Sequence, residues 1–132
     1  MNKKTVLIVE DELDMRIFIS TLLETSGYAP VMTRDGKEGL IKARDVSPDL
    51  IILDVMMPGE GGVQMFRQLK TDQTLKAIPV IMLSAVAQKT FSHYLNMVNA
   101  RLDKPIPRPD AYIEKPPEAE ELLKMTASLI GQ

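Results

Sequence analysis

The sequence contains no cysteine and no tryptophan, and its only histidine is His93. Without cysteine the chain can form no disulfide, no thiolate nucleophile and no thiolate-bound zinc site. No apolar run approaches the roughly 20 residues that a membrane span needs, and the residues after Met1 show no signal-peptide pattern, so we expect a cytoplasmic protein. The formal charge of -2 offers no basic excess for nucleic acid. We therefore expect neither nucleic acid nor a membrane as a partner.

The 132 residues fit one domain, and a composition of 45% hydrophobic and 26% charged residues is ordinary for a globular protein. Short strand-like runs alternate with helical patterns along the chain, which predicts a doubly wound α/β fold: a parallel sheet with helices on both faces. The strand-like runs are Thr5 to Val9, Pro30 to Thr33, Asp49 to Leu53, Pro79 to Leu83 and a short fifth run, Ala111 to Ile113. Helices are expected over Leu13 to Ser26, from Asp35 onward, and over Gly62 to Lys70, Thr90 to Leu102 and Glu118 to Ile130.

Two helix ends carry recognisable stop and start signals. Gly27 follows the first helix, whose apolar stripe includes Ile17, Phe18 and Ile19. The spacing of Asp35 to Glu38 resembles a capping box, so Asp35 is expected to cap the second helix.

The segment from Asp103 to Asp110 has three prolines in five residues, at positions 105, 107 and 109. Proline lacks the backbone donor and has a fixed φ, which excludes regular structure. We expect an extended surface loop.

Carboxylates follow two of the predicted strands. Asp54 ends an unbroken aliphatic run, and Glu10, Asp11 and Glu12 follow the first strand. If these strands are neighbours, like charges meet at the carboxyl edge of the sheet, where ligands of open α/β sheets bind. Mg²⁺, which prefers oxygen ligands, would relieve the repulsion. The simpler alternative is that Asp11 or Glu12 only caps the first helix.

Two more strand ends add complementary groups: the hydroxyl of Ser84 and the ammonium of Lys115. A carboxylate can accept a phosphoryl group, and phosphoryl transfer requires cationic stabilisation of the phosphoryl oxygens. The combination predicts phosphoryl chemistry at Asp54.

From Thr5 to Ile130 the chain resembles the response-regulator receiver domains of two-component phosphorelay signalling. The resemblance rests on four ordered motifs: VLIVED at 6–11, LDVMMPG at 53–59 with Gly61 and Gly62, PVIMLSA at 79–85 and YIEKP at 112–116. It implies a CheY-like, flavodoxin-like fold with five strands in the order 2-1-3-4-5.

The resemblance also implies a role for each strand-end residue. Asp54 is the expected phosphoacceptor, and Ser84 and Lys115 bind the phosphoryl group. Mg²⁺ is the expected cofactor, and its ligands would be Glu10, Asp11, Asp54 and the backbone carbonyl of Met56. The Lys115–Pro116 bond is a candidate cis peptide. Ser84 and Tyr112 form the expected switch, in which phosphorylation draws the hydroxyl inward and the aromatic ring follows.

By the same resemblance the donor would be a histidine of a partner histidine kinase or histidine phosphotransfer protein. His93 lies in a variable region and is expected on the surface. The face formed by the fourth helix, fifth strand and fifth helix would contact an unknown downstream protein or a second copy. We expect a signalling phosphoacceptor with no output domain and not an enzyme, apart from self-catalysed phosphoryl transfer and autodephosphorylation.

The chain departs from the family pattern in two places. Glu10 stands where Asp is more frequent, so direct or water-mediated metal binding is open. The segment from Ser84 to Lys115 is longer than usual by roughly ten residues, which fall in the proline-rich insertion at about 103–110. Lys104–Pro105 is a rival Lys-Pro pair, but only Lys115 follows a hydrophobic strand with an aromatic three residues earlier. The apolar Met56 and Val86 beside the site predict a fairly long-lived phosphoryl group.

Three alternatives stay open. A haloacid-dehalogenase-type enzyme would need an acid/base Asp where Met56 stands. A flavodoxin-like cofactor binder would need a phosphate-binding loop where Glu10-Asp11-Glu12 repels phosphate. A phosphate-independent receiver-like interaction module would use the altered loop to hold its partner.

Overall fold

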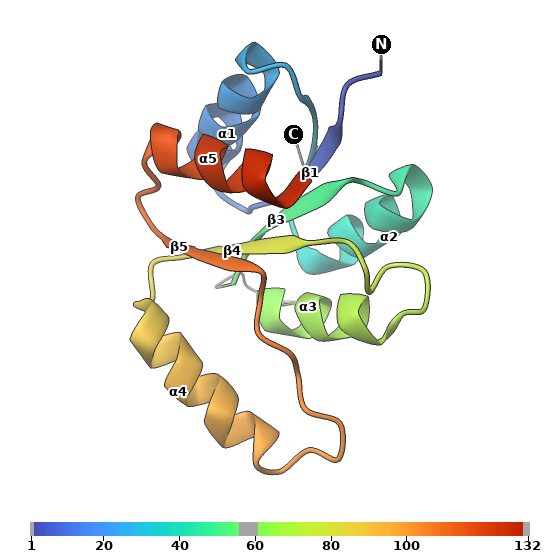
Figure 1. Cartoon of the computed structure of the whole chain (residues 1–132), viewed down its shortest axis with the longest axis vertical. Coiled ribbons are helices and arrows are strands. Elements are labelled where there is room, and N and C mark those ends of the chain that lie inside the picture. Colours follow the sequence, from blue (N-terminus) through green and yellow to red (C-terminus); the bar gives the residue numbers. More distant parts are fainter. Residues whose placement is uncertain (1, 56–60, 131–132) are drawn as a thin grey trace.

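The computed structural model describes residues 2–55 and 61–130, which form an open sheet between two layers of helices (Figure 1). The five strands are β1 (Thr5–Val9), β2 (Ala29–Thr33), β3 (Leu50–Asp54), β4 (Val80–Ser84) and β5 (Ala111–Glu114). The helices are α1 (Leu13–Thr25), α2 (Gly36–Val46), α3 (Gly62–Thr71), α4 (Gln88–Asn99) and α5 (Ala119–Ile130). All pairings are parallel and the strand order is β2-β1-β3-β4-β5. The expected doubly wound α/β fold and strand order are confirmed.

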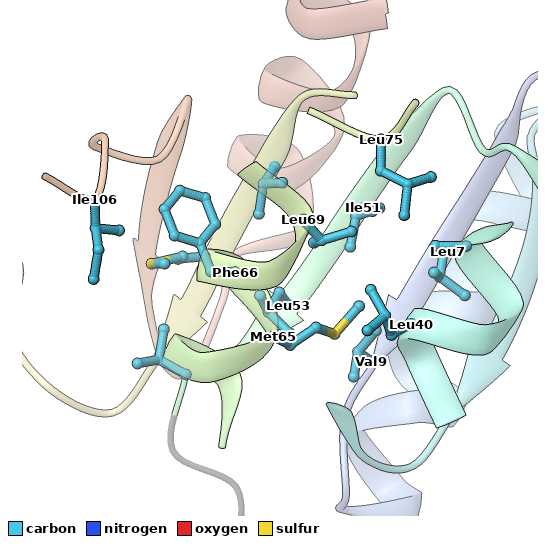
Figure 2. Packing of buried hydrophobic residues seen from close by; sticks show 14 of the residues in the cluster. Leu7, Val9, Leu40, Ile51, Leu53, Met65, Phe66, Leu69, Leu75 and Ile106 are labelled. Carbon is cyan, nitrogen blue, oxygen red and sulfur yellow. The ribbon is translucent and has the colours of Figure 1, made fainter. Parts of the chain in front are cut away.

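Alternate residues of the strands point to opposite faces of the sheet, and each face has its own core. Leu7 and Val9 of β1 pack in a cluster with residues of α2, α3 and α4, whereas Val6 and Ile8 pack with residues of α1 and α5. Since both faces are covered, the central strand β3 is buried throughout. Figure 2 shows part of the first cluster, in which Met65 and Phe66 of α3 lie over the sheet.

Local capping chemistry explains where two helices begin and end. The Asp35 side chain accepts a hydrogen bond from the backbone N–H of Glu38 at 2.8 Å, which confirms the predicted N-cap of α2. The Glu38 carboxylate turns back to the N–H of Arg34 rather than to that of Asp35. After α1, Gly27 has a φ of +95°, a left-handed conformation that glycine adopts without strain.

The predicted apolar stripe of α1 is wider than the face that the helix buries. Ile19 is fully buried, but Ile17 and Phe18 are 51% and 40% exposed. The apolar stripe that the sequence shows is therefore present, but Ile17 and Phe18 lie at its exposed side.

The segment between α4 and β5 has no regular structure, as its prolines predicted, but it is not wholly superficial. Ile106 is only 6% exposed and belongs to the same cluster as Phe66, across from which it lies in Figure 2. The Asn99 side chain binds both backbone polar groups of Ile106: its amide donates to the carbonyl at 2.9 Å and its oxygen accepts from the N–H at 2.7 Å. A single aliphatic side chain thus anchors this loop in the core.

Among the helices of the described ranges, none combines the length and apolar character needed to cross a bilayer.

Candidate functional site

The side chains expected to carry chemistry lie at the carboxyl edge of the sheet. Glu10 follows β1, Asp54 ends β3, Ser84 ends β4 and Lys115 follows β5. The register pairs Asp54 with Leu83 and Ser84 with Glu114, which aligns the ends of the three strands. Parallel pairing therefore gathers groups that are far apart in sequence.

Three carboxylates form a compact cluster at this edge. Glu10, Asp11 and Asp54 each offer an oxygen, and these oxygens lie within 4.8 Å of one another. Glu10 is 1% exposed and Asp54 is 3% exposed, whereas Asp11 faces solvent. Burial strengthens the mutual repulsion because little water screens it.

Lys115 is the cation that faces this cluster. Its Nζ lies 2.8 Å from Glu10 Oε1, 3.3 Å from Asp54 Oδ2 and 3.6 Å from Glu12 Oε1. Burial by itself would lower the pKa of Lys115, but the Glu10 and Asp54 carboxylates outweigh burial and raise it. Lys115 is thus held in its charged form, and the bond to Pro116 is cis, as the family resemblance implied.

Lys115 alone does not neutralise the negative charge of the three carboxylates. Burial raises the pKa of Glu10 to about 7 and the Asp54 charge adds to the rise, while Lys115 and the Glu12 backbone N–H offset part of it. Glu10 Oε1 is buried and meets Lys115 Nζ at 2.8 Å as an ion pair, but this contact does not have the angles of a full hydrogen bond, and within the described ranges the oxygen accepts none. A buried carboxylate oxygen of this kind, with two more carboxylates beside it, fits a hard cation such as Mg²⁺.

The simpler capping explanation does not account for these acids. Glu12 is the N-cap residue of α1 but its side chain makes no capping hydrogen bond. Its backbone N–H instead donates to Glu10 Oε2 at 3.0 Å, and Arg16 Nη1 donates to the Glu10 and Asp11 carbonyls at 2.8 and 3.0 Å. These bonds hold the β1–α1 turn and aim Glu10 at the cluster. Sequence reasoning missed Arg16, because nothing in the pattern of α1 marks an arginine that folds back on the preceding turn.

Gly62 was noted only as part of a motif, yet its lack of a side chain is essential at the first turn of α3. A Cβ at this position would overlap the backbone carbonyl oxygen of Asp54 and would lie 2.7 Å from the Val55 Cα. The start of α3 therefore rests directly on the backbone of the central carboxylate residue.

Ser84 and Tyr112 lie on adjacent strands, next to the loop that leads into α4. Ser84 is fully buried and its Oγ accepts from the Val86 N–H at 2.9 Å. Tyr112 lies inward: its hydroxyl donates to the Val86 carbonyl at 2.6 Å and its ring stacks on Phe91, with 5.3 Å between centroids. Burial raises the pKa of Tyr112, and the Ser84 hydroxyl offsets part of that rise. An aromatic residue on the edge strand β5 could simply have kept its hydroxyl in water, but the bond to Val86 and the burial of Tyr112 contradict that simpler alternative.

The remaining candidates are separated from the cluster or fall outside the described ranges. Lys104 lies in the insertion and lines a different cavity. Of the two lysines that precede a proline, Lys115 is therefore the one that contacts Asp54. His93 is exposed on α4, as expected. Met56, the expected carbonyl ligand, lies outside the described residues.

Comparison with known proteins gives a consistent result. The family model described as "Response regulator receiver domain" matches residues 6–127. The polar-differentiation response regulator DivK of Brucella ovis is 36% identical over 129 residues, covering 97% of both chains. The chemotaxis protein CheY4 of Vibrio cholerae superposes with a TM-score of 0.82 at 26% identity, covering 97% of this chain and 99% of that one. The receiver domain of the Pseudomonas aeruginosa sensor histidine kinase PA1611 has the same fold, with a TM-score of 0.83 at 24% identity over 99% of this chain and 100% of that one.

Proposed function

Since the chain belongs to the response regulator receiver family, we propose that it is a phosphorylatable receiver of a two-component phosphorelay. In this proposal Asp54 accepts a phosphoryl group from a histidine of a partner histidine kinase or phosphotransfer protein. The observation that carries the proposal is the buried Asp54 carboxylate at a strand end, with Lys115 Nζ 3.3 Å away and two further carboxylates alongside.

The transfer is a direct displacement at phosphorus. An oxygen of Asp54 forms the new O–P bond while the N–P bond of the phosphohistidine breaks, and the imidazole nitrogen keeps the electron pair. Lys115, held charged between Glu10 and Asp54, stabilises the negative charge on the phosphoryl oxygens. The Ser84 hydroxyl, buried one strand away, would donate a hydrogen bond to one of those oxygens.

Three residues fit the proposed metal. Magnesium bound by Glu10, Asp11 and Asp54 would supply positive charge beside the transferring group. The longer side chain of Glu10 still brings one carboxylate oxygen within 4.8 Å of oxygens of Asp11 and Asp54.

The output in this proposal is a population shift. The inward Tyr112, bonded to Val86 and stacked on Phe91, is the arrangement that phosphorylation would favour. The surface of α4, β5 and α5 would then contact a downstream protein or a second copy. In this proposal the receiver domain acts in the cytoplasm, and its contact with a downstream protein or a second copy transmits the signal.

The test is intact-mass measurement after incubation with Mg²⁺ and acetyl phosphate. We expect a gain of about 80 Da, the mass of one added phosphoryl group. The gain should disappear in Asp54→Asn and in the presence of excess EDTA, while Asp11→Asn should reduce it. No gain from acetyl phosphate or from a phosphorylated histidine kinase, in protein with native circular dichroism, would refute the proposal and favour a phosphate-independent interaction module.

A further inference from the structure

A second cavity lies away from the carboxylate cluster, between the end of α3, the segment that follows it and the proline-rich loop. Its volume is about 390 Å³, within the range of cavities that hold small ligands. The residues around it are Arg67, Lys70, Thr71, Gln73, Lys76, Lys104, Pro105, Ile106 and Pro107. Four of them are cations and none is a carboxylate, in a chain whose formal charge is -2.

Three of these cations form no ion pair within residues 2–55 and 61–130. Arg67, Lys76 and Lys104 are exposed and make no ion pair with any residue that the structure describes. They come from α3, the segment after it and the loop, so the fold brings them together from three separate parts of the chain. Like charges that gather without counter-charge repel one another, and a bound anion would relieve that repulsion.

The fourth cation, Lys70, is fixed and largely buried. Its side chain is 12% exposed, and its Nζ donates to the carbonyls of Lys76 and Ile78 at 3.1 and 3.0 Å. Its nearest carboxylate, that of Asp110, is 3.9 Å away and also accepts the Val80 N–H at 2.8 Å. Lys70 is therefore already held by two carbonyls and by Asp110, and it forms a fixed part of the cavity lining beside the three exposed cations.

The loop wall is held in place. Ile106 is anchored in the core and bound to Asn99 by two hydrogen bonds, which positions the flanking residues Pro105 and Pro107 at the cavity. These prolines add apolar surface to a cavity whose other residues are mostly charged or polar. A wall of this kind suits a ligand that carries a compact polyanion and a flat organic portion.

We propose that this cavity binds a small molecule with a diphosphate group, and that Lys76 and Lys104 contact its phosphate oxygens. A diphosphate matches several converging cations better than a single carboxylate does, because its charge is spread over more oxygens. The concave shape and limited size favour a free small molecule over a polymer. The site is separate from the carboxylate cluster, and the proposal concerns binding by the unphosphorylated protein.

The test is a titration of the whole, unphosphorylated protein with inorganic pyrophosphate and, separately, with ADP. Both are followed by two-dimensional amide NMR in EDTA at constant ionic strength, because without metal the carboxylate cluster repels phosphate. We expect saturable shifts at Thr71, Lys76 and Ile106, and none at Ser84 or Lys115. Tighter binding of ADP than of pyrophosphate would support contact between the organic portion and the proline wall.

The matched variants each remove two exposed lysines. Lys76→Ala/Lys104→Ala should weaken binding at least tenfold, whereas Lys37→Ala/Lys42→Ala on α2 should change it less than twofold. Equal weakening in both variants would mean general charge attraction and would overturn the proposal, as would shifts confined to the Asp54 cluster or no saturable shift with either probe. None of these results bears on the acetyl phosphate test, which reports on Asp54 alone.

Discussion

The chain contains two Lys-Pro dipeptides, and their lysines lie in opposite electrostatic surroundings. Lys115 is one cation among three carboxylates within 4 Å, and its side chain is 15% exposed. Lys104 is exposed and lines a cavity with three other cations and no carboxylate. The dipeptide itself therefore carries little information. The difference comes from what precedes it: Lys115 follows a strand that ends at the carboxyl edge of the sheet, and Lys104 follows a helix and enters a loop.

The largest expected effect concerns these two lysines directly. Lys115→Ala should slow phosphorylation of Asp54 by acetyl phosphate about 10²- to 10³-fold, the usual cost of removing one group that stabilises transition-state charge. Lys104→Ala should leave the rate within twofold. The rates are measured by intact mass over time in Mg²⁺. Equal rates for the two variants would contradict the assignment of Lys115, rather than Lys104, to the phosphorylation site.

The next effect tests whether the loop that carries Lys104 belongs to the core. Ile106→Ala should lower the free energy of unfolding by about 2–4 kcal/mol, because it leaves a cavity beside Phe66. The matched change Ile41→Ala removes the same atoms from a side chain that is 54% exposed, and should cost less than about 0.5 kcal/mol. Urea denaturation gives both values. Similar losses would mean that the loop is a surface segment after all.

A smaller loss of stability is expected from the hydrogen bond between Tyr112 and the loop that leads into α4. Tyr112→Phe removes the hydroxyl that donates to the Val86 carbonyl and keeps the ring stacked on Phe91, so stability should fall by about 0.5–1.5 kcal/mol. Tyr94→Phe, on a side chain that is 47% exposed, serves as the control and should have little effect. Thermal unfolding followed by circular dichroism measures both. Unchanged stability in Tyr112→Phe would mean that the bond to Val86 contributes nothing.

The smallest effect concerns an acid beside the basic cavity. Hydrogen bonds from the Thr74 hydroxyl and N–H lower the pKa of Asp72 below its ordinary value of 3.8. Its contribution to stability is therefore present above pH 3.8 and is lost as the pH falls through the lower folded-state pKa. Asp72→Asn should make stability less dependent on pH below about 4, with only a small loss at pH 7. Melting temperatures from pH 2 to 7, with Asp45→Asn on α2 as control, test this. A steeper acid dependence in Asp72→Asn would contradict the assignment.

The carboxyl-edge site could be predicted because its positions follow from strand ends. Asp54 ends one predicted strand and Lys115 follows another, so a parallel sheet brings both to the same edge whatever lies between them. The metal-ligand carbonyl of Met56 and the phosphoryl roles remain predictions, as does the long lifetime of the phosphoryl group.

The basic cavity and its anchor could not be predicted in the same way. Ile106 stands alone between two prolines, so no periodicity marks it as buried, and its burial depends on the space beside Phe66. Arg67, Lys76 and Lys104 belong to three segments that no strand end aligns. The exposure of Ile17 and Phe18 has a similar origin, since an apolar stripe shows which face of a helix is hydrophobic but not how much of it the neighbours cover.

Gly62 couples the position of α3 directly to the backbone of Asp54 and Val55. Side chains between packed elements act as compliant spacers, because rotamer changes absorb small movements before they spread. No such spacer exists between the first turn of α3 and the backbone of Asp54 and Val55. A shift of that backbone must therefore displace α3 itself, and the far end of the same helix carries Arg67 and Lys70 to the basic cavity.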